Sequence, residues 1–229
     1  MSREERKSLR PQGGQLSCGV DEAGRGCLAG PIFAAAVILD PRRPVEGLAD
    51  SKSLSPVRRE ELFEEIRSKA LAYGVAWATV KEIDARGIEW ANRIAFSRAV
   101  RALLRSAPWI DRQALVLRID GNRPALRLRI PQELIPGGDA SVAEIAAASI
   151  LAKCSRDRYV VRTLHAAYPE YGFDRHKGYA TRAHREAIRT WGPTPHHRMS
   201  FCLAGRAAAD RGKGEPPGRR RDGREVATG

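Results

Sequence analysis

The sequence has no long hydrophobic run. Its longest relevant apolar stretch, residues 32–39, is far shorter than the roughly 20 residues that a membrane-spanning helix needs. Residues 1–10 alternate arginine, glutamate and lysine around no apolar core, so we expect no secretory signal. We therefore expect no membrane partner.

Cysteine is scarce. The four residues Cys18, Cys27, Cys154 and Cys202 form no C-x-x-C pair and show no zinc-ligand spacing. Reduced thiols in a cytoplasmic protein fit this pattern best, and nothing in it supports disulfides.

Acidic residues are too few to balance the basic ones. Lys+Arg 40 against Asp+Glu 27 gives a formal net charge of +13 and a pI of about 10.2. Such a surface attracts polyanions, of which nucleic acid is the commonest. A basic tail without a specific role would give the same balance. Charge therefore indicates a class of partner and says nothing of chemistry.

Composition divides the chain into three parts. Residues 1–15 form a polar leader, residues 16–204 a globular domain without internal repeats, and residues 205–229 a tail rich in Gly, Pro, Arg and Asp. We expect the tail to be disordered, with Arg219, Arg220 and Arg221 either tethering nucleic acid or simply solvated. We expect the protein to be a monomer.

Hydrophobic periodicity predicts strands mixed with helices, followed by a helical region. The expected strands are residues 16–20, 32–39, 74–80, 114–119 and 126–130, the last from its alternating leucine and arginine. The expected helices are residues 56–70, 88–104 and 142 to about 167. Ser55 as N-cap and Pro56 in the first turn mark the start of the first helix. The pattern is that of an α/β domain with a helical C-terminal portion from about residue 142.

Acidic side chains occur where apolar strands are expected to end. Asp21 and Glu22 follow the first strand, Asp120 ends the fourth, and Asp139 precedes the long third helix. Each has an ordinary alternative, since Asp139 could cap its helix and Asp120 could be a turn residue. Because neighbouring strand residues face opposite sides, Asp21 and Glu22 converge only if the chain bends at the glycines that follow.

The coincidence of these acids in a basic protein favours a metal site. If the first and fourth strands are neighbours, their terminal carboxylates share one end of the sheet. Clustered carboxylates repel one another unless a cation neutralises them, and hard oxygen ligands suit Mg²⁺ or Mn²⁺. An acidic, metal-binding centre on a basic surface indicates a metal-dependent phosphodiesterase.

The glycines of residues 24–30 also invite a dinucleotide-binding interpretation, which fails on context. A dinucleotide loop must open a helix whose N-terminus holds the pyrophosphate. Here Pro31 and a further expected strand follow the loop, and two carboxylates precede it.

At these residues the chain closely resembles the bacterial ribonuclease HII family, over about residues 18–201. Several blocks occur in the family's order. They are Gly19-Val20-Asp21-Glu22-Ala23-Gly24-Arg25-Gly26, Leu48-Ala49-Asp50-Ser51-Lys52-Ser53-Leu54, Ile119-Asp120-Gly121-Asn122-Arg123, Gly138-Asp139, Ile145-Ala146-Ala147-Ala148-Ser149-Ile150-Leu151-Ala152-Lys153, Tyr171-Gly172-Phe173, His176-Lys177-Gly178-Tyr179 and His197-Arg198-Met199-Ser200-Phe201.

The resemblance implies a fold, a metal centre and a substrate. The fold is ribonuclease H-like, a mixed β-sheet flanked by helices with a helical C-terminal region. The metal ligands and catalytic carboxylates fall on Asp21, Glu22, Asp120 and Asp139, and Mn²⁺ or Mg²⁺ is the expected cofactor. The substrates are RNA–DNA hybrids and duplex DNA that contains ribonucleotides.

The resemblance also assigns substrate contacts. The element Gly24, Arg25 and Gly26 is expected to read the ribose 2′-OH at an RNA–DNA junction, largely through backbone groups, and glycines permit that approach. Tyr179 is expected to stack on the following deoxyribonucleotide, although a lone tyrosine more often packs a core. Lys52 and Lys177 are expected to contact phosphates, although surface lysines are usually just solvated.

The chain departs from the family pattern at two helix starts. Gly137 stands where the family often has lysine, and Arg86-Gly87 replaces an asparagine-containing pattern. Both departures bear on helix starts or phosphate contacts.

The related type III enzymes carry an extra N-terminal domain and a lysine in the glycine element, and we expect neither here. No catalytic role is expected for the histidines, and His196 and His197 are expected to pack a loop.

The leading hypothesis is a metal-dependent endonuclease that cuts 5′ of a ribonucleotide and leaves 3′-OH and 5′-phosphate ends. It would remove RNA during replication and repair. The first alternative is a non-catalytic basic nucleic-acid-binding protein, whose binding would ignore divalent ions. The second is a metal phosphatase acting on a small ester, which the positive charge disfavours.

Overall fold

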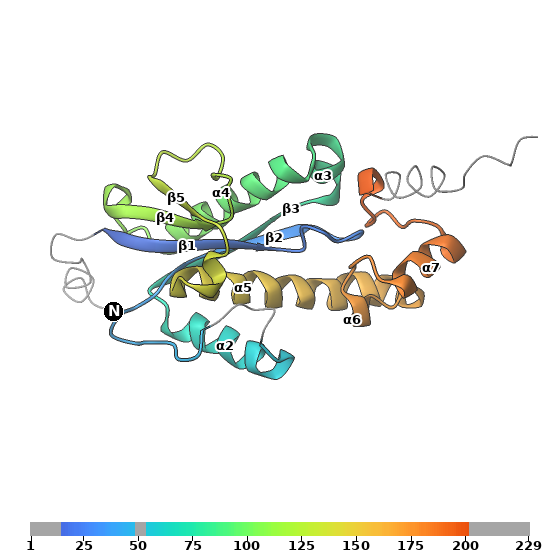
Figure 1. Ribbon diagram of the computed structural model, residues 1–229, viewed down its shortest axis with the longest axis horizontal. Coiled ribbons are helices and arrows are strands. Elements are labelled where there is room, and N and C mark those ends of the chain that lie inside the picture. Colours follow the sequence, from blue (N-terminus) through green and yellow to red (C-terminus); the bar gives the residue numbers. More distant parts are fainter. Residues whose placement is uncertain (1–14, 49–53, 202–229) are drawn as a thin grey trace, which may run out of the picture.

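The computed structural model describes residues 15–48 and 54–201 (Figure 1). The expected tail, Lys52 and all but the last residue of the expected leader lie outside these ranges. The domain boundaries therefore stay predictions.

A mixed five-stranded sheet forms the centre of the molecule. Its strands are β1 (Leu16–Ala23), β2 (Ile32–Ile38), β3 (Ala72–Ala78), β4 (Leu115–Asp120) and β5 (Gln132–Ile135). Their order in space is β3-β2-β1-β4-β5. β2 runs antiparallel to β1 and β3, while β4 runs parallel to β1 and β5. Because β1 and β4 are parallel neighbours, their carboxyl ends lie at the same edge of the sheet.

Helices cover both faces of the sheet. α4 (Ile88–Ser106) lies on one face, and α5 (Ala143–Tyr159) lies on the other with α2 (Pro56–Lys69) packed outside it (Figure 1). Side chains of β1 alternate between the two layers, as strand geometry requires. Cys18 and Val20 pack in the apolar cluster under α4, whereas Ala23 packs with α5.

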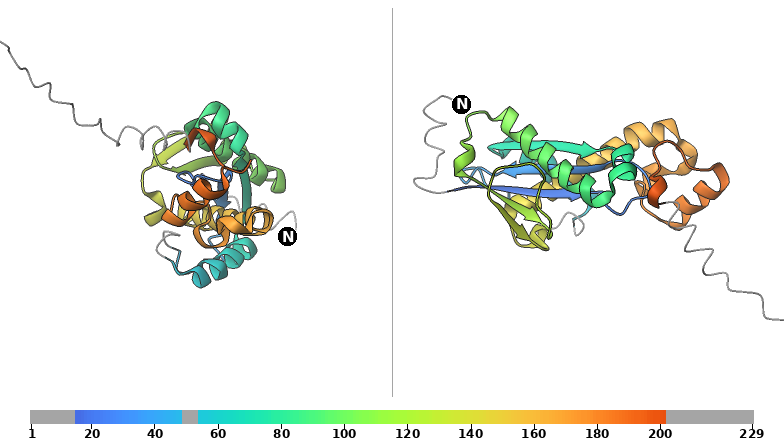
Figure 2. Two further views of the ribbon diagram at one scale, coloured as in Figure 1. Left: turned by 90° about the vertical axis from the view of Figure 1, so that its right-hand side faces the viewer. Right: turned by 90° about the horizontal axis from the view of Figure 1, so that it is seen from above.

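The C-terminal helices gather at one end of the sheet (Figure 2). α5 continues into the π-helical turn η3 (Val160–His165). The short helices η4 (Pro169–Tyr171) and α6 (Phe173–His176) and the longer α7 (Arg182–Trp191) follow. No helix in the described ranges is both long and apolar enough to cross a bilayer.

The expected helices and four of the expected strands are present. Ser55 caps α2 by accepting a hydrogen bond from the Arg58 backbone N–H at 3.2 Å. The third strand ends at Ala78, before the expected residue 80, because Thr79 starts α3 (Val80–Arg86). Thr79 and Glu82 form a reciprocal capping box there, which the sequence interpretation missed.

The expected strand at residues 126–130 is wrong. Arg127 has a φ of 57°, a left-handed conformation that no continuous strand contains. Leu126 and Leu128 nevertheless pack against the core under α4, so a folded loop produces the alternation of leucine and arginine. The fifth strand is β5, which begins at Gln132 and pairs with β4.

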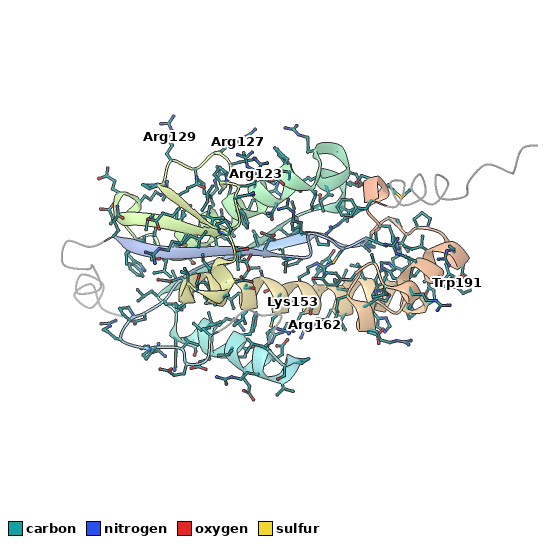
Figure 3. All side chains as sticks on the ribbon, in the orientation of Figure 1. Arg123, Arg127, Arg129, Lys153, Arg162 and Trp191 are labelled. Atoms are coloured by element: carbon teal, nitrogen blue, oxygen red, sulfur yellow. The ribbon has the colours of Figure 1, made fainter. Side chains whose placement is uncertain are left out.

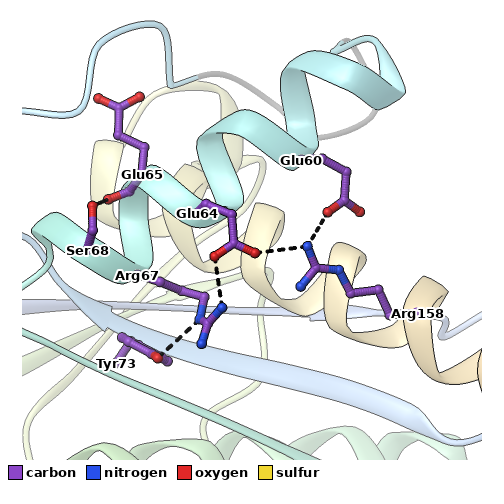
Figure 4. Close-up of polar contacts among 7 residues, drawn as sticks. All are labelled: Glu60, Glu64, Glu65, Arg67, Ser68, Tyr73 and Arg158. Atoms are coloured by element: carbon purple, nitrogen blue, oxygen red, sulfur yellow. Dashed lines mark hydrogen bonds and ion pairs between the residues drawn. The ribbon is translucent and has the colours of Figure 1, made fainter.

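An ionic network ties α2 to α5 on the outer layer (Figure 4). Arg158 of α5 forms ion pairs with Glu60 and, at 3.0 Å, with Glu64 of α2. Arg67 bridges Glu64 at 2.9 Å and donates to the Tyr73 hydroxyl at 3.2 Å. Arg67 and Arg158 on this layer therefore have acidic partners.

Glu82 is expected to make stability pH-dependent. Its carboxylate caps α3 and binds Arg98 of α4 at 2.5 Å, and these contacts lower its pKa to about 2. Because the folded pKa lies below the unfolded value near 4.5, the contribution is full above pH 4.5 and is lost as the pH falls toward 2. We expect Glu82→Gln to cost about 1–2 kcal/mol at pH 7, after allowance for solvent screening of this partly exposed pair.

Urea unfolding at pH 7, 5 and 3.5 measures this difference. The gap between the wild type and Glu82→Gln should persist at pH 5 and shrink at pH 3.5. Glu61→Gln is the matched control, because Glu61 forms an exposed pair with Arg58 whose loss should cost less than about 0.5 kcal/mol. A gap for Glu82→Gln that does not change with pH would contradict the assignment.

Candidate active site

Strand β1 carries two of the predicted carboxylates on opposite sides. The strand runs on to Ala23, so it does not end at Val20 and the chain does not bend between Asp21 and Glu22. Asp21 shares the α5 side with Ala23 and is 4% exposed, while Glu22 points toward α4. The Glu22 backbone N–H donates to Asp21 Oδ1 at 2.6 Å.

Asp120 lies beside Asp21, because β1 and β4 are parallel and Val20 pairs with Ile119. Asp21 directly follows Val20, and Asp120 directly follows Ile119. The two acids are therefore also in register, and both side chains lie on the α5 side of the sheet. Asp120 Oδ1 accepts a hydrogen bond from the Gly138 N–H at 2.8 Å, which draws η2 (Gly138–Ala140) to the strand end. Asp139 in η2 is 7% exposed. The expectation that the first and fourth strands are neighbours is confirmed.

The electrostatics of this group fit a cation. Burial, and then the negative charges of Glu22 and Asp120, raise the pKa of Asp21 well above its usual range, against the hydrogen bonds that lower it. A divalent ion would offset both the desolvation and the repulsion, and carboxylate oxygens are ligands that Mg²⁺ and Mn²⁺ accept. Within the described residues, no three His, Cys, Asp or Glu side chains already form a metal-ligand cluster. A cation would therefore have to draw the carboxylates together.

Asn92 of α4 positions Glu22. Its amide donates to Glu22 Oε2 at 3.1 Å, and the side chain is only 2% exposed. Sequence reasoning missed Asn92, although its place on the buried side of the predicted helix was a signal for it.

Two buried arginines frame the glycine turn that follows β1. Arg198 donates to the carbonyls of Gly24 and Arg25, both at 2.7 Å, and to that of Gly30 at 2.9 Å. Arg156 of α5 lies so close that a Cβ on Gly24, whose φ is 90°, would come within 1.9 Å of its Nε. Only glycine fits there. The motif at residues 197–201 contains Arg198 but does not indicate its role, and no sequence pattern predicted the role of Arg156.

The side chain of Arg25 extends away from this frame. Its guanidinium binds Glu89 of α4 at 2.5 Å, and Arg123 binds the same carboxylate at 3.4 Å. The backbone of the turn is thus fixed by Arg198, while the Arg25 charge is held over the start of α4.

Tyr179 lies beside the same turn. It is 38% exposed, its hydroxyl contacts the Cys27 thiol, and Lys153 Nζ lies 5.1 Å from the ring centroid. Burial of its inner part raises the pKa of the Tyr179 hydroxyl. A half-exposed ring beside the glycine turn is a suitable stacking surface for a nucleotide. Lys177, by contrast, directs its ammonium to the backbone carbonyl of Asp174.

The histidines behave as packing residues. His184 Nε2 lies 3.0 Å from His197 Nε2, and both rings are buried against Phe173. Burial lowers the pKa of each to about 4, so both are neutral near pH 7. His197 Nδ1 accepts from the Thr194 N–H at 2.8 Å, and the Gly30 N–H donates to the His196 carbonyl at 2.8 Å. The expected loop-packing role matches these contacts.

The two departures from the family pattern fall at left-handed positions. Gly87 has a φ of 79° between α3 and α4, and Gly137 has a φ of 68° before η2. Both helix starts form without side-chain caps. Glycine is suited to each because it adopts positive φ without strain.

Comparison with known proteins agrees with this layout. The family model for Ribonuclease HII matches residues 18–204. A Ribonuclease HII from Cupriavidus necator is 52% identical over 195 residues, 85% of this chain and 79% of that protein. One from Burkholderia mallei is 54% identical over 190 residues, 82% of this chain and 84% of that protein. The crystal structure of ribonuclease H2 from Pyrococcus horikoshii aligns with a TM-score of 0.66 at 27% identity, covering 86% of this chain and 99% of that one.

A ribonuclease H-like sheet with acids at the ends of β1 and β4 defines a metal-dependent endoribonuclease. Within that class, the chain belongs to the ribonuclease HII family. The family is dependent on divalent metal ions and acts on RNA–DNA hybrids.

Proposed function

We propose that this ribonuclease H incises 5′ of a ribonucleotide, both in hybrids and at single ribonucleotides embedded in duplex DNA. The products are 3′-OH and 5′-phosphate ends, and the role is RNA removal in replication and ribonucleotide excision repair. The observation that carries the proposal is the continuity of β1, which places Asp21 and the glycine turn on one rigid strand end beside Asp120.

The carboxylates are proposed to hold the metal and to bring it to the scissile phosphate. Asp21, Glu22, Asp120 and Asp139 are the proposed ligands, with Asn92 orienting Glu22. When bound, divalent cations activate water and stabilise the leaving oxygen. The burial of Asp21 and Asp139 keeps bulk water from screening that charge.

The glycine turn is proposed to discriminate ribose from deoxyribose. Arg198 occupies the carbonyls of Gly24 and Arg25, so it fixes the orientation of these peptide groups before substrate arrives. A fixed backbone that approaches the sugar closely can distinguish a 2′-OH from hydrogen. Tyr179 is proposed to stack on the adjacent deoxyribonucleotide.

A duplex with one central ribonucleotide tests the proposal. With Mn²⁺ or Mg²⁺ we expect a single cut on its 5′ side, and an all-DNA duplex of the same sequence should stay intact. End-labelled products resolved on a gel, with and without phosphatase treatment, identify the cut and its ends. Binding that falls with salt, ignores divalent ions and produces no cut would favour the non-catalytic alternative.

We also propose that the protein works as a cytoplasmic monomer. Cys18, Cys27 and Cys154 are buried free thiols, which a reducing compartment maintains.

A further inference from the structure

An arginine-lined hollow of about 450 Å³ opens between the C-terminal half of α4 and the loop that precedes β5. We call it the arginine hollow. Its floor is apolar, formed by Leu104, Leu128 and Ile130, and no carboxylate of residues 15–48 or 54–201 lines it. Its walls carry five arginines, which are Arg101, Arg105, Arg112, Arg127 and Arg129.

The five arginines of the hollow have no acidic partner among the described residues. In the described part of the chain, none of the five forms an ion pair, whereas Arg58, Arg67 and Arg158 on the opposite layer all do. Like charges crowded around one hollow repel each other, and an anion placed between them relieves that repulsion. The hollow is therefore a site suited to phosphate groups, which the forked guanidinium binds with two donors.

The loop that carries Arg127 and Arg129 is held in a strained shape. Arg127 has a φ of 57°, which is unfavourable for a side chain of this size. Arg101 donates to the Arg127 carbonyl at 2.9 Å, and Arg93 donates to the Pro124 carbonyl at 2.8 Å. α4 thus imposes the bend that turns both loop arginines outward. Strain that persists under such restraints is commonest at binding sites.

Two arginines of the hollow, Arg127 and Arg129, lie on the loop that follows Asp120 of the candidate active site. The chain leaves β4 at Asp120, passes Arg123 and then reaches Arg127 and Arg129. Figure 3 shows these three arginines along one edge of the molecule, on the α4 side of the sheet. A duplex that reaches Asp120 at the end of β4 and extends across the edge of the sheet along this loop would present backbone phosphates to Arg127 and Arg129.

We propose that the arginine hollow binds backbone phosphates of the substrate duplex beyond the cleavage position. The inference rests on the proposed function, which places the duplex on the carboxylates. A duplex suits the observations better than an acidic peptide, because the loop that carries Arg127 and Arg129 starts at Asp120, where the substrate duplex is proposed to lie. Its contacts ignore base sequence and depend on salt.

The test uses two duplexes of equal length and charge. Each has about 20 base pairs, a length of about 68 Å, and contains one ribonucleotide. In one duplex the ribonucleotide lies about 4 pairs from the 5′ end of its strand, and in the other about 4 pairs from the 3′ end. The ribonucleotide fixes the register, so only one duplex extends over the hollow. Binding is measured in the absence of divalent ions for Arg105→Gln/Arg129→Gln. We expect about tenfold weaker binding of one duplex, under twofold for the other, and a salt slope lower by about 2 for the affected one.

The control Arg58→Gln/Arg67→Gln removes the same charge from α2 on the opposite layer and should bind both duplexes as the wild type does. Equal weakening of both duplexes, or of neither, by Arg105→Gln/Arg129→Gln would overturn the proposal. So would an oligoglutamate peptide that binds the wild type, loses affinity for the variant and leaves duplex binding unchanged. Failure of the proposed function can be distinguished from failure of this inference. In that case the wild type would cut neither duplex at the ribonucleotide when Mn²⁺ is supplied.

Discussion

Asp120→Asn is expected to lower the rate of hybrid cleavage at least about 1000-fold. The substitution keeps the shape of the side chain and an oxygen that can accept the Gly138 N–H, so η2 should stay in place. It removes the negative charge that lies beside Asp21 and that a divalent cation would need. Stability should be unchanged or slightly higher, because repulsion within the acidic group decreases. Hybrid binding should change little.

Single-turnover cleavage at saturating Mn²⁺, together with binding measured without metal, checks this prediction. Asp111→Asn is the matched control, since Asp111 caps the 3-10 turn η1 (Arg112–Ala114) just before the same strand and is exposed. The control should keep full activity. More than about a tenth of wild-type activity in Asp120→Asn would remove Asp120 from the metal centre.

Arg198→Met is expected to cost about 3–5 kcal/mol of stability and at least about 100-fold in cleavage rate. The fully buried guanidinium satisfies three carbonyls, and burial lowers its pKa only to about 10, so it stays charged at pH 7. Methionine fills a similar volume but leaves the three carbonyls unpaired. Without them fixed, the glycine turn loses the orientation that we propose reads the 2′-OH.

Chemical denaturation and cleavage of a single-ribonucleotide duplex measure the two effects. Arg198→Lys should fall between the wild type and Arg198→Met, because an ammonium keeps the charge but cannot span three acceptors in the same geometry. Arg189→Met is the control, because Arg189 forms an exposed pair with Glu186 in α7 and is remote in sequence from the glycine turn. Wild-type activity in a folded Arg198→Met would show that the turn needs no such frame.

Sequence patterns located most secondary structure because burial follows local periodicity. The helix started by Ser55 and the strands that contain Val20 and Ile119 were predicted from such patterns. The strand at residues 126–130 was wrong because a loop pressed on α4 also buries alternate residues. Periodicity reports which side chains face a core and does not report whether the backbone is extended.

The sequence by itself determined the acids Asp21, Glu22, Asp120 and Asp139, the glycine turn and the family resemblance. Those features are local, since residue type and neighbours along the chain define them. Only the tertiary structure decided that Asp21 and Asp120 share a face while Glu22 faces α4. It also decided that Arg198, more than 170 residues along the chain, holds the Gly24 carbonyl. Such contacts depend on strand register and on how distant segments pack, which no local pattern encodes.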